Sequence, residues 1–253
     1  MENRSREGKQ SSYEQVQGPT VMTFGQLLAA STPRYFVVPA LIGLNVVIFA
    51  LMVLLGVSLF SPTAGQLFVW GANYGPATLG GQWWRMLSST FVHGGIMHLA
   101  LNMQCLWQLG KMTERLYGNW AFLALYVLSG LGGSIASLWG SPNAVSVGAS
   151  GAIFGIAGGL VVFLYLGKLP IPRTATRSIL SSTMIFVGYN LLFGFASTGI
   201  DNAAHIGGFV TGALVGALLT RPLPPPKGLS RLPRALVAVG LILLLILGTL
   251  LAG

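Results

Sequence analysis

Seven apolar stretches run through this sequence, and each is long enough to span, or nearly span, the hydrocarbon core of a membrane. The second and sixth are shortened by polar residues, and we expect their helices to extend further. The stretches lie at Tyr35–Leu59, Ile96–Leu109, Trp120–Trp139, Val147–Leu166, Ile179–Phe195, Ala203–Leu219 and Ala235–Leu251. Only 8 % of the residues are charged, whereas soluble proteins carry about a quarter. Such a chain cannot cover a globular surface with polar groups, so the sequence predicts an all-α, multi-pass membrane protein.

The basic residues are distributed unevenly between the loops. If the seven stretches are spans, 13 of the 14 Lys and Arg residues fall on one face of the membrane, and only Arg85 falls on the other. Cytoplasmic loops carry an excess of Lys and Arg, so we predict a cytoplasmic N-terminus and an outward C-terminus. The net charge of +9 is then a consequence of topology, and nucleic acid is not expected as a partner.

The chain divides into four predicted parts. Residues 1–34 form a polar cytoplasmic tail, expected to lack regular structure to about residue 32, although Val21–Ala30 can lie along the membrane surface. Residues 35–220 form a six-helix core, whose long first loop is rich in aromatic residues and should dip into the outer leaflet. Residues 221–234 form a Pro-rich basic linker, a stiff and extended spacer, and residues 235–253 form a seventh transmembrane helix.

Polar side chains within spans are costly, so each is a candidate functional residue. The second span carries His98 and Asn102, which lie one helical turn apart on the same face. Both can donate hydrogen bonds without carrying a charge, which suits an oxyanion that appears only in a transition state. Hydrogen bonding between helices is the alternative explanation.

A second polar site opens the fourth span, with Gly148, Ser150 and Gly151. A serine at a helix start has free backbone N–H groups beside it, and flanking glycines permit the close approach of a substrate. The sixth span opens with Asp201 and then His205, a candidate general base inside an apolar run. Taken separately, Ser150 is weak evidence because a Ser-Gly helix start is frequent, and a hydrogen-bonded structural histidine is the favoured explanation of His205.

Glycine repeats connect the two polar sites. The fourth and sixth spans each carry three glycines at four-residue spacing: Gly151, Gly155 and Gly159, and Gly208, Gly212 and Gly216. Such repeats let two helix backbones approach closely in lipid. If the two glycine faces meet, Ser150 and His205 lie at the same end of the contact, and a serine beside a neutral histidine is an activated nucleophile.

With these residues in place, the sequence from about Phe36 to Leu219 resembles the rhomboid intramembrane serine proteases. The matching residues occur in the family's order, at similar spacing and on the expected spans. They are Trp84, Arg85, His93, His98, Asn102, Glu114, Gly118, Gly148, Ser150, Gly151, Ala204, His205, Gly207 and Gly208.

The resemblance implies a fold, an activity and a role for each residue. The implied fold is a six-helix bundle plus one C-terminal helix, with a water-accessible cavity open to the outer side. The implied activity is the cleavage of single-span membrane proteins after small residues. Ser150 would be the nucleophile and His205 the general base, with an oxyanion hole formed by His98, Asn102 and the Ser150 N–H. The supporting residues would be His93 at the cavity, Gly148 and Gly151 beside the nucleophile, Trp84 and Arg85 in the first loop, and Phe154 stacked on His205, where some relatives carry Tyr.

Asp201 is the only aspartate in the chain and lies four residues before His205. A Ser-His-Asp triad is therefore conceivable. We favour a helix cap, because an aspartate at a helix start accepts hydrogen bonds from free N–H groups, and because the family that the chain resembles works with a Ser-His dyad.

Three other functions compete with proteolysis. His and Asn within a membrane also line channels and transporters, although a transport pathway gives no reason for the glycine-flanked Ser150. A zinc site built from His93, His98 and His205 lacks the H-E-x-x-H pattern and a nearby glutamate. A catalytically inactive relative acting as a membrane chaperone would not need both Ser150 and His205. We therefore expect a protease without cofactor or metal, whose partners are the lipid bilayer and transmembrane substrates, in a bacterial plasma membrane.

Overall fold

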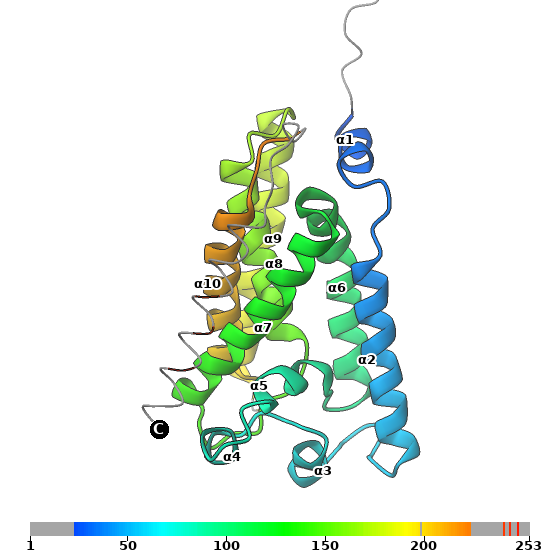
Figure 1. Cartoon of the computed structure of the whole chain (residues 1–253), viewed down its shortest axis with the longest axis vertical. Coiled ribbons are helices and arrows are strands. Elements are labelled where there is room, and N and C mark those ends of the chain that lie inside the picture. The colour runs from blue at the N-terminus through cyan, green and yellow to red at the C-terminus, as the bar shows by residue number, and fades with distance from the viewer. Residues whose placement is uncertain (1–22, 198, 224–239, 241–242, 244–246, 248–253) are drawn as a thin grey trace, which may run out of the picture.

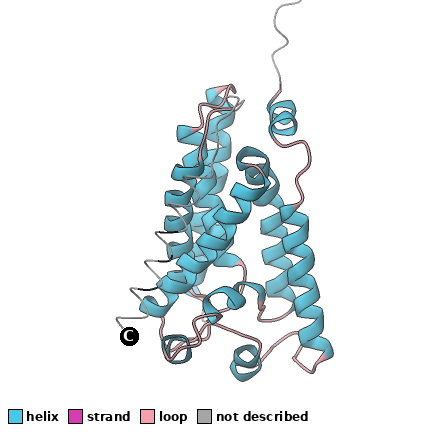
Figure 2. Cartoon of the chain, in the orientation of Figure 1, coloured by secondary structure: helices cyan, strands magenta, loops and turns pink. Residues whose placement is uncertain are grey.

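A computed structural model describes residues 23–197 and 199–223, together with Gly240, Leu243 and Leu247. Residues 1–22 of the predicted tail, most of the predicted linker and nearly all of the predicted seventh helix lie outside the described residues. In the described part, helices are joined by loops (Figure 2), and the only β-type pairing is one isolated bridge between Asn73 and Ser146. The predicted all-α class is confirmed for this part of the chain.

Long helices make up the bundle (Figure 1), and they follow the first six apolar stretches. They are α2 (Val37–Leu54), α6 (Ile96–Tyr117), α7 (Asn119–Gly140), α8 (Ser150–Leu166), α9 (Arg173–Ala196) and α10 (Asn202–Leu219). By length and composition, α2, α7, α9 and α10 can cross a membrane. The shorter α8 is apolar but has 17 residues, and α6 has 22 residues with several polar side chains. The chain is thus an integral membrane protein, and the count of six spans plus one stays a prediction.

The centre of the bundle is α8, in which every residue from Gly151 to Leu160 is buried. It packs against α7, α10 and α6. By contrast, α9 buries only Thr183, Val187 and Gly194, so most of its surface is free to face lipid. A serine at the start of α8 therefore sits at the end of the most enclosed helix of the molecule.

The predicted glycine contact is confirmed. A side chain at Gly208 would collide with the backbone of Gly151, one at Gly212 with Gly155, and one at Gly216 with Gly159. The two repeats face each other in register, so α8 and α10 approach with no side chain between them. This contact fixes the position of His205 along α10 relative to Ser150 on α8.

A buried carboxylate joins α2 to α6. Both oxygens of Glu114 accept hydrogen bonds from the first backbone N–H groups of α2: those of Phe36 and Val37 at 2.9 and 2.8 Å and that of Val38 at 2.8 Å. These N–H groups have no partner within their own helix. Glu114 thus caps α2 although it lies 76 to 78 residues away in the sequence. Local sequence patterns do not reveal a cap from so distant a residue.

The first loop and the tail contain more structure than the sequence suggested. The loop forms α3 (Ala64–Val69), α4 (Gly75–Leu79), α5 (Arg85–Ser88) and a 3-10 turn, η1 (Ser89–Phe91). In the tail, Phe24–Ser31 forms α1, which opens with a capping box made by Thr23 and Gln26. This helix overlaps Val21–Ala30, the stretch excepted from the expectation of a structureless tail, and the capping pair satisfies its first N–H groups.

Candidate active site

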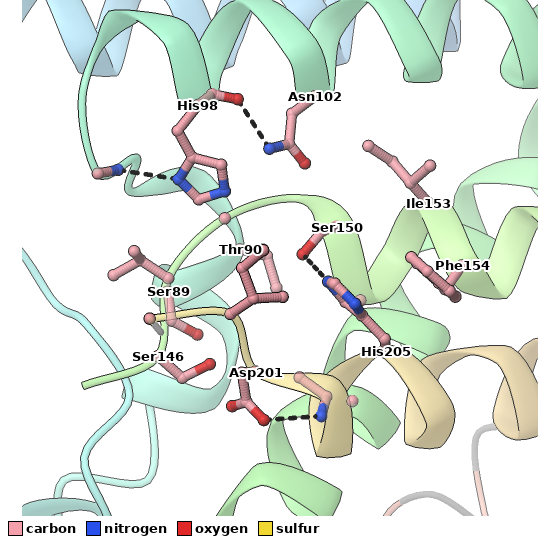
Figure 3. Close-up of a pocket in the computed structure, with 18 of the residues that line it drawn as sticks. Ser89, Thr90, His98, Asn102, Ser146, Ser150, Ile153, Phe154, Asp201 and His205 are labelled. Carbon is pink, nitrogen blue, oxygen red and sulfur yellow. Dashed lines mark hydrogen bonds between the residues drawn. The ribbon is translucent and has the colours of Figure 1, made fainter. Parts of the chain in front are cut away.

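Ser150 and His205 meet across the contact between α8 and α10. The Oγ of Ser150 lies 2.9 Å from the Nε2 of His205, within hydrogen-bond distance (Figure 3). Ser150 is the first residue of α8, and His205 lies in the first turn of α10. The structure thus brings together two residues that are 55 positions apart in the sequence.

The imidazole of His205 is held by a ring and not by a carboxylate. The ring of Phe154 stacks on it with centroids 4.2 Å apart and an interplanar angle of 7°. The Nδ1 of His205 is buried and has no hydrogen-bond partner among the described residues. Phe154 lies four residues after Ser150, so one face of α8 carries both the serine and the ring that orients the histidine.

The carboxylate of Asp201 accepts two hydrogen bonds, and neither comes from the imidazole of His205. Its Oδ1 accepts from the N–H of Ala204 at 3.0 Å, and its Oδ2 accepts from the hydroxyl of Ser137 near the end of α7 (Figure 3 draws the former). The first bond is the helix cap that the sequence favoured. The second bond, which sequence reasoning missed, attaches the start of α10 to α7.

His98 and Asn102 lie on the other side of Ser150 from His205 (Figure 3). The N–H of Gly94 donates to Nδ1 of His98 at 3.1 Å, so the neutral ring carries its proton on Nε2. The Nδ2 of Asn102 donates one hydrogen to the carbonyl oxygen of His98 at 2.8 Å, which leaves its second hydrogen available. Each side chain thus retains one donor on the cavity side of α6.

Gly148 is required by two separate features of the structure. Its φ of +113° is one that side chains other than glycine rarely adopt. A Cβ atom there would also lie 2.8 Å from Nε2 of His98. The glycine therefore lets the imidazole of His98 pack directly on the backbone that precedes Ser150. Gly151 is buried at the close approach of α8, α7 and α10.

The turn before Ser150 is held by the first loop. Asn73 and Ser146 exchange two backbone hydrogen bonds, and the N–H of Gly148 donates to the carbonyl oxygen of Ser89 at 2.9 Å. His93 is fully buried behind this turn, where its Nε2 accepts from the N–H of Ala149 at 3.5 Å. Burial lowers the pKa of His93 to about 3, so this ring stays neutral and can accept that bond at physiological pH.

Arg85 holds the first loop together from inside. Its guanidinium donates to the carbonyl oxygens of Phe68 and Ala72 at 2.7 and 3.1 Å, and it lies over the rings of Phe68 and Trp84 at 3.9 and 4.6 Å. A buried guanidinium needs several partners of this kind. Trp84 and Arg85 therefore act on the loop that supports the Ser150 turn, and not on the site directly.

Ser150, His205, His98 and Asn102 face a cavity of about 600 Å³. Its lining comes from α3, η1, α6, α7, α8, α9 and α10 and from the turn before α8, and it includes Ser150, His205, His98, Asn102 and Asp201. Within the described part of the chain, no group of three or more His, Cys, Asp or Glu residues is arranged to hold a metal ion. The arrangement offers a nucleophile, a base and two uncharged donors, which is the set needed for acyl transfer.

Comparison with known proteins gives consistent matches. The family model for the Rhomboid domain matches residues 80–222. The chain is 38 % identical over 200 residues to "Rhomboid protease GluP" of Bacillus subtilis, covering 79 % of this chain and 38 % of that protein. It is 36 % identical over 172 residues to "Rhomboid protease AarA" of Providencia stuartii, covering 59 % and 60 % of the two chains. It is also 40 % identical over 144 residues to "RHOMBOID-like protein 4" of Arabidopsis thaliana, covering 56 % of this chain and 36 % of that one. The matched regions thus span less than two thirds of each relative.

Proposed function

Since this chain belongs to the rhomboid family, we propose that it is an intramembrane serine endopeptidase with Ser150 as nucleophile and His205 as general base. Relatives that are named as proteases support an intramembrane protease. The observation that carries the assignment of residues is the 2.9 Å separation of Ser150 Oγ and His205 Nε2.

In the proposed mechanism, Nε2 of His205 accepts the proton of the Ser150 hydroxyl as Oγ attacks the carbonyl carbon of the substrate. The tetrahedral intermediate collapses when Nε2 returns that proton to the leaving amine, and water then hydrolyses the acyl-enzyme by the same two proton transfers. Each general acid–base step of this kind contributes about 10²–10⁴-fold.

The oxyanion would be stabilised by Nε2–H of His98, the free amide hydrogen of Asn102 and the backbone N–H of Ser150. All three residues line the cavity, and His98 and Asn102 lie across Ser150 from His205 (Figure 3). Loss of one such donor costs about 10²–10³ in kcat in other serine hydrolases. None of the three carries a charge, so none needs a counter-ion when no oxyanion is present.

Substrates are proposed to be transmembrane proteins, cut in or near their membrane-spanning segments. A buried site with few charges can accept a segment from lipid without placing ions in hydrocarbon. We also propose that the site opens towards the outer side, in a bacterial plasma membrane. Both proposals extend the family's properties and the charge distribution to this chain.

The direct test uses the purified full chain in vesicles with a labelled transmembrane substrate. Ser150→Ala and His205→Ala should each abolish cleavage. Ser150→Ala should also abolish labelling of the protein by a fluorophosphonate. Ser182→Ala is the matched control, because the Ser182 hydroxyl is exposed on α9 and bonds only to the carbonyl oxygen of Ile179. Equal cleavage by wild type and both site variants, or no cleavage of any of several substrates, would overturn the proposal and favour a transporter or an inactive chaperone.

A further inference from the structure

A groove lies between α2 and α6, away from the proposed active site. Its volume is about 520 Å³, and apolar side chains dominate its lining. It is lined by Pro39, Ile42 and Gly43 from α2 and by Ala100, Met103, Gln104 and Trp107 from α6. A Cβ atom at Gly43 would meet no atom within 4 Å, so the described protein atoms leave this side of the groove open.

Two cations stand next to this groove. Lys111 follows Trp107 by one turn of α6, and its Nζ lies 4.3 Å from the centre of that ring. Arg115 follows by another turn, with its guanidinium 4.8 Å from the ring of Tyr35. Tyr35 and Trp107 are themselves in ring contact, with centroids 6.5 Å apart. The two cations and two rings thus form one cluster that continues the groove.

The described structure does not neutralise these charges. Like charges four residues apart on a helix destabilise it. Only Glu114 and Asp201 are acidic among the described residues. Glu114 turns both oxygens inward to the N–H groups of α2, and Asp201 is bound to Ala204 and Ser137. An anion from outside the described chain would therefore be favourable at Lys111 and Arg115.

The position of the cluster along the helix identifies that anion. Arg115 is 17 residues beyond His98, or about 25 Å along α6, which places the cluster close to the opposite membrane interface from the cavity. Trp and Tyr are the residues that favour this level. The groove runs from the cluster towards the middle of the bilayer, in the direction of an acyl chain.

We propose that this groove and cluster bind one anionic phospholipid, with its phosphate at Lys111 and Arg115 and an acyl chain between Gly43 and Ala100. The charges, the aromatic rings and the apolar groove all match parts of the same molecule. The site needs no property of Ser150 or His205, so it stands or falls independently of the proposed protease activity.

The test is to count retained lipids. The full chain is reconstituted in equal amounts of dioleoyl phosphatidylglycerol and dioleoyl phosphatidylcholine, extracted in mild detergent and examined by native mass spectrometry. The wild type should keep one phosphatidylglycerol in preference to phosphatidylcholine. The double variant Lys111→Gln/Arg115→Gln should lose this preference, by about fivefold for each cation removed.

Two control variants make the test specific. Arg173→Gln/Arg177→Gln removes another pair of cations at the same spacing, from the start of α9, and should retain the preference. Gly43→Leu fills the groove and should reduce the bound lipid, whereas Gly188→Leu, at another glycine that faces open space, should not. No preference in the wild type would mean that only bulk lipid covers the cations. That result, or equal losses in the control variants, would overturn the proposal.

Discussion

At the scale of single residues, orientation of His205 depends on contacts that can be removed one at a time. The imidazole has a stacked ring on one face, and its Nδ1 has no hydrogen-bond partner among the described residues. The proposed dyad lacks the carboxylate that fixes the tautomer in a triad. Packing must therefore supply the orientation, and variants of the packing residues should change kcat more than KM.

Phe154 is the first of these residues. Phe154→Ala should lower kcat by roughly tenfold, because a stacked aromatic pair contributes about 0.5–1.5 kcal/mol beyond its buried area. Phe154→Tyr keeps the ring face against His205 and should retain most activity. Steady-state kinetics on a transmembrane substrate measures both. If Phe154→Ala kept wild-type kcat, the stacked ring would have no part in orienting the base.

Asp201 distinguishes a positioning role from a triad. Asp201→Asn should retain most activity, since the amide oxygen can still cap Ala204 and the amide nitrogen can donate to the Ser137 hydroxyl. Asp201→Ala loses the cap, worth about 0.5–2 kcal/mol, and should lower both kcat and thermal stability. Ser137→Ala should lower kcat less than Asp201→Ala does, because it removes one of the two bonds. Near-complete inactivation by Asp201→Asn would restore the triad.

Gly148 tests the support of His98. Gly148→Ala should reduce kcat strongly, because the added methyl group would displace the imidazole of His98 as well as strain the backbone. Gly81→Ala is its control, since Gly81 also has a positive φ of +107° but faces open space. Kinetics and unfolding midpoints of both variants separate the two effects. Equal losses of kcat in the two variants would mean that backbone strain alone matters.

At the scale of elements, the contact of α8 with α10 determines whether Ser150 and His205, the proposed nucleophile and base, meet at all. Gly212 lies two helical turns from His205, and a side chain there would collide with the backbone of Gly155. Gly212→Ala should therefore lower stability by about 1–3 kcal/mol and inactivate the protein without touching the site. Gly188→Ala, in open space on α9, should be neutral or slightly stabilising. Thermal unfolding in detergent compares them, and an unaffected Gly212→Ala would contradict the tight packing of the two repeats.

The sequence predicted two features of the fold, namely the helices that lipid surrounds and the helix contact that a glycine repeat forms. The first six apolar stretches correspond to long helices, because in lipid every backbone N–H and C=O group must find its hydrogen-bond partner within the protein. The glycine repeats predicted the α8–α10 contact, because the same four-residue spacing on both helices indicates which glycines lie opposite each other. The bond from Ser137 to Asp201, the cap of α2 by Glu114 and the loop contacts of Arg85 were missed. Each joins residues far apart in sequence, and a single polar residue carries no periodic signal of its distant partner.

At the scale of the whole molecule, the charge distribution predicts how the bundle lies in the membrane. The cavity and the Lys111–Arg115 cluster are at opposite ends of α6. The side of the membrane that one of them faces therefore determines the side that the other faces. The positive-inside rule places the cluster in the cytoplasm and the cavity outside. Both the alternation of the spans, to which this rule was applied, and the direction of insertion remain predictions.

Labelling of single cysteines tests that direction. In a Cys105→Ser background, Asn143→Cys lies in the exposed loop between α7 and α8, and Arg173→Cys lies at the exposed start of α9. With the cavity outside, a membrane-impermeant maleimide should label Asn143→Cys in intact cells, and Arg173→Cys only after permeabilisation. Both positions are exposed, so a difference between them reports sidedness and not burial. The reverse pattern would place Ser150 at the cytoplasmic face, and substrates would then have to present their cleavage sites from the cytoplasmic side of the membrane.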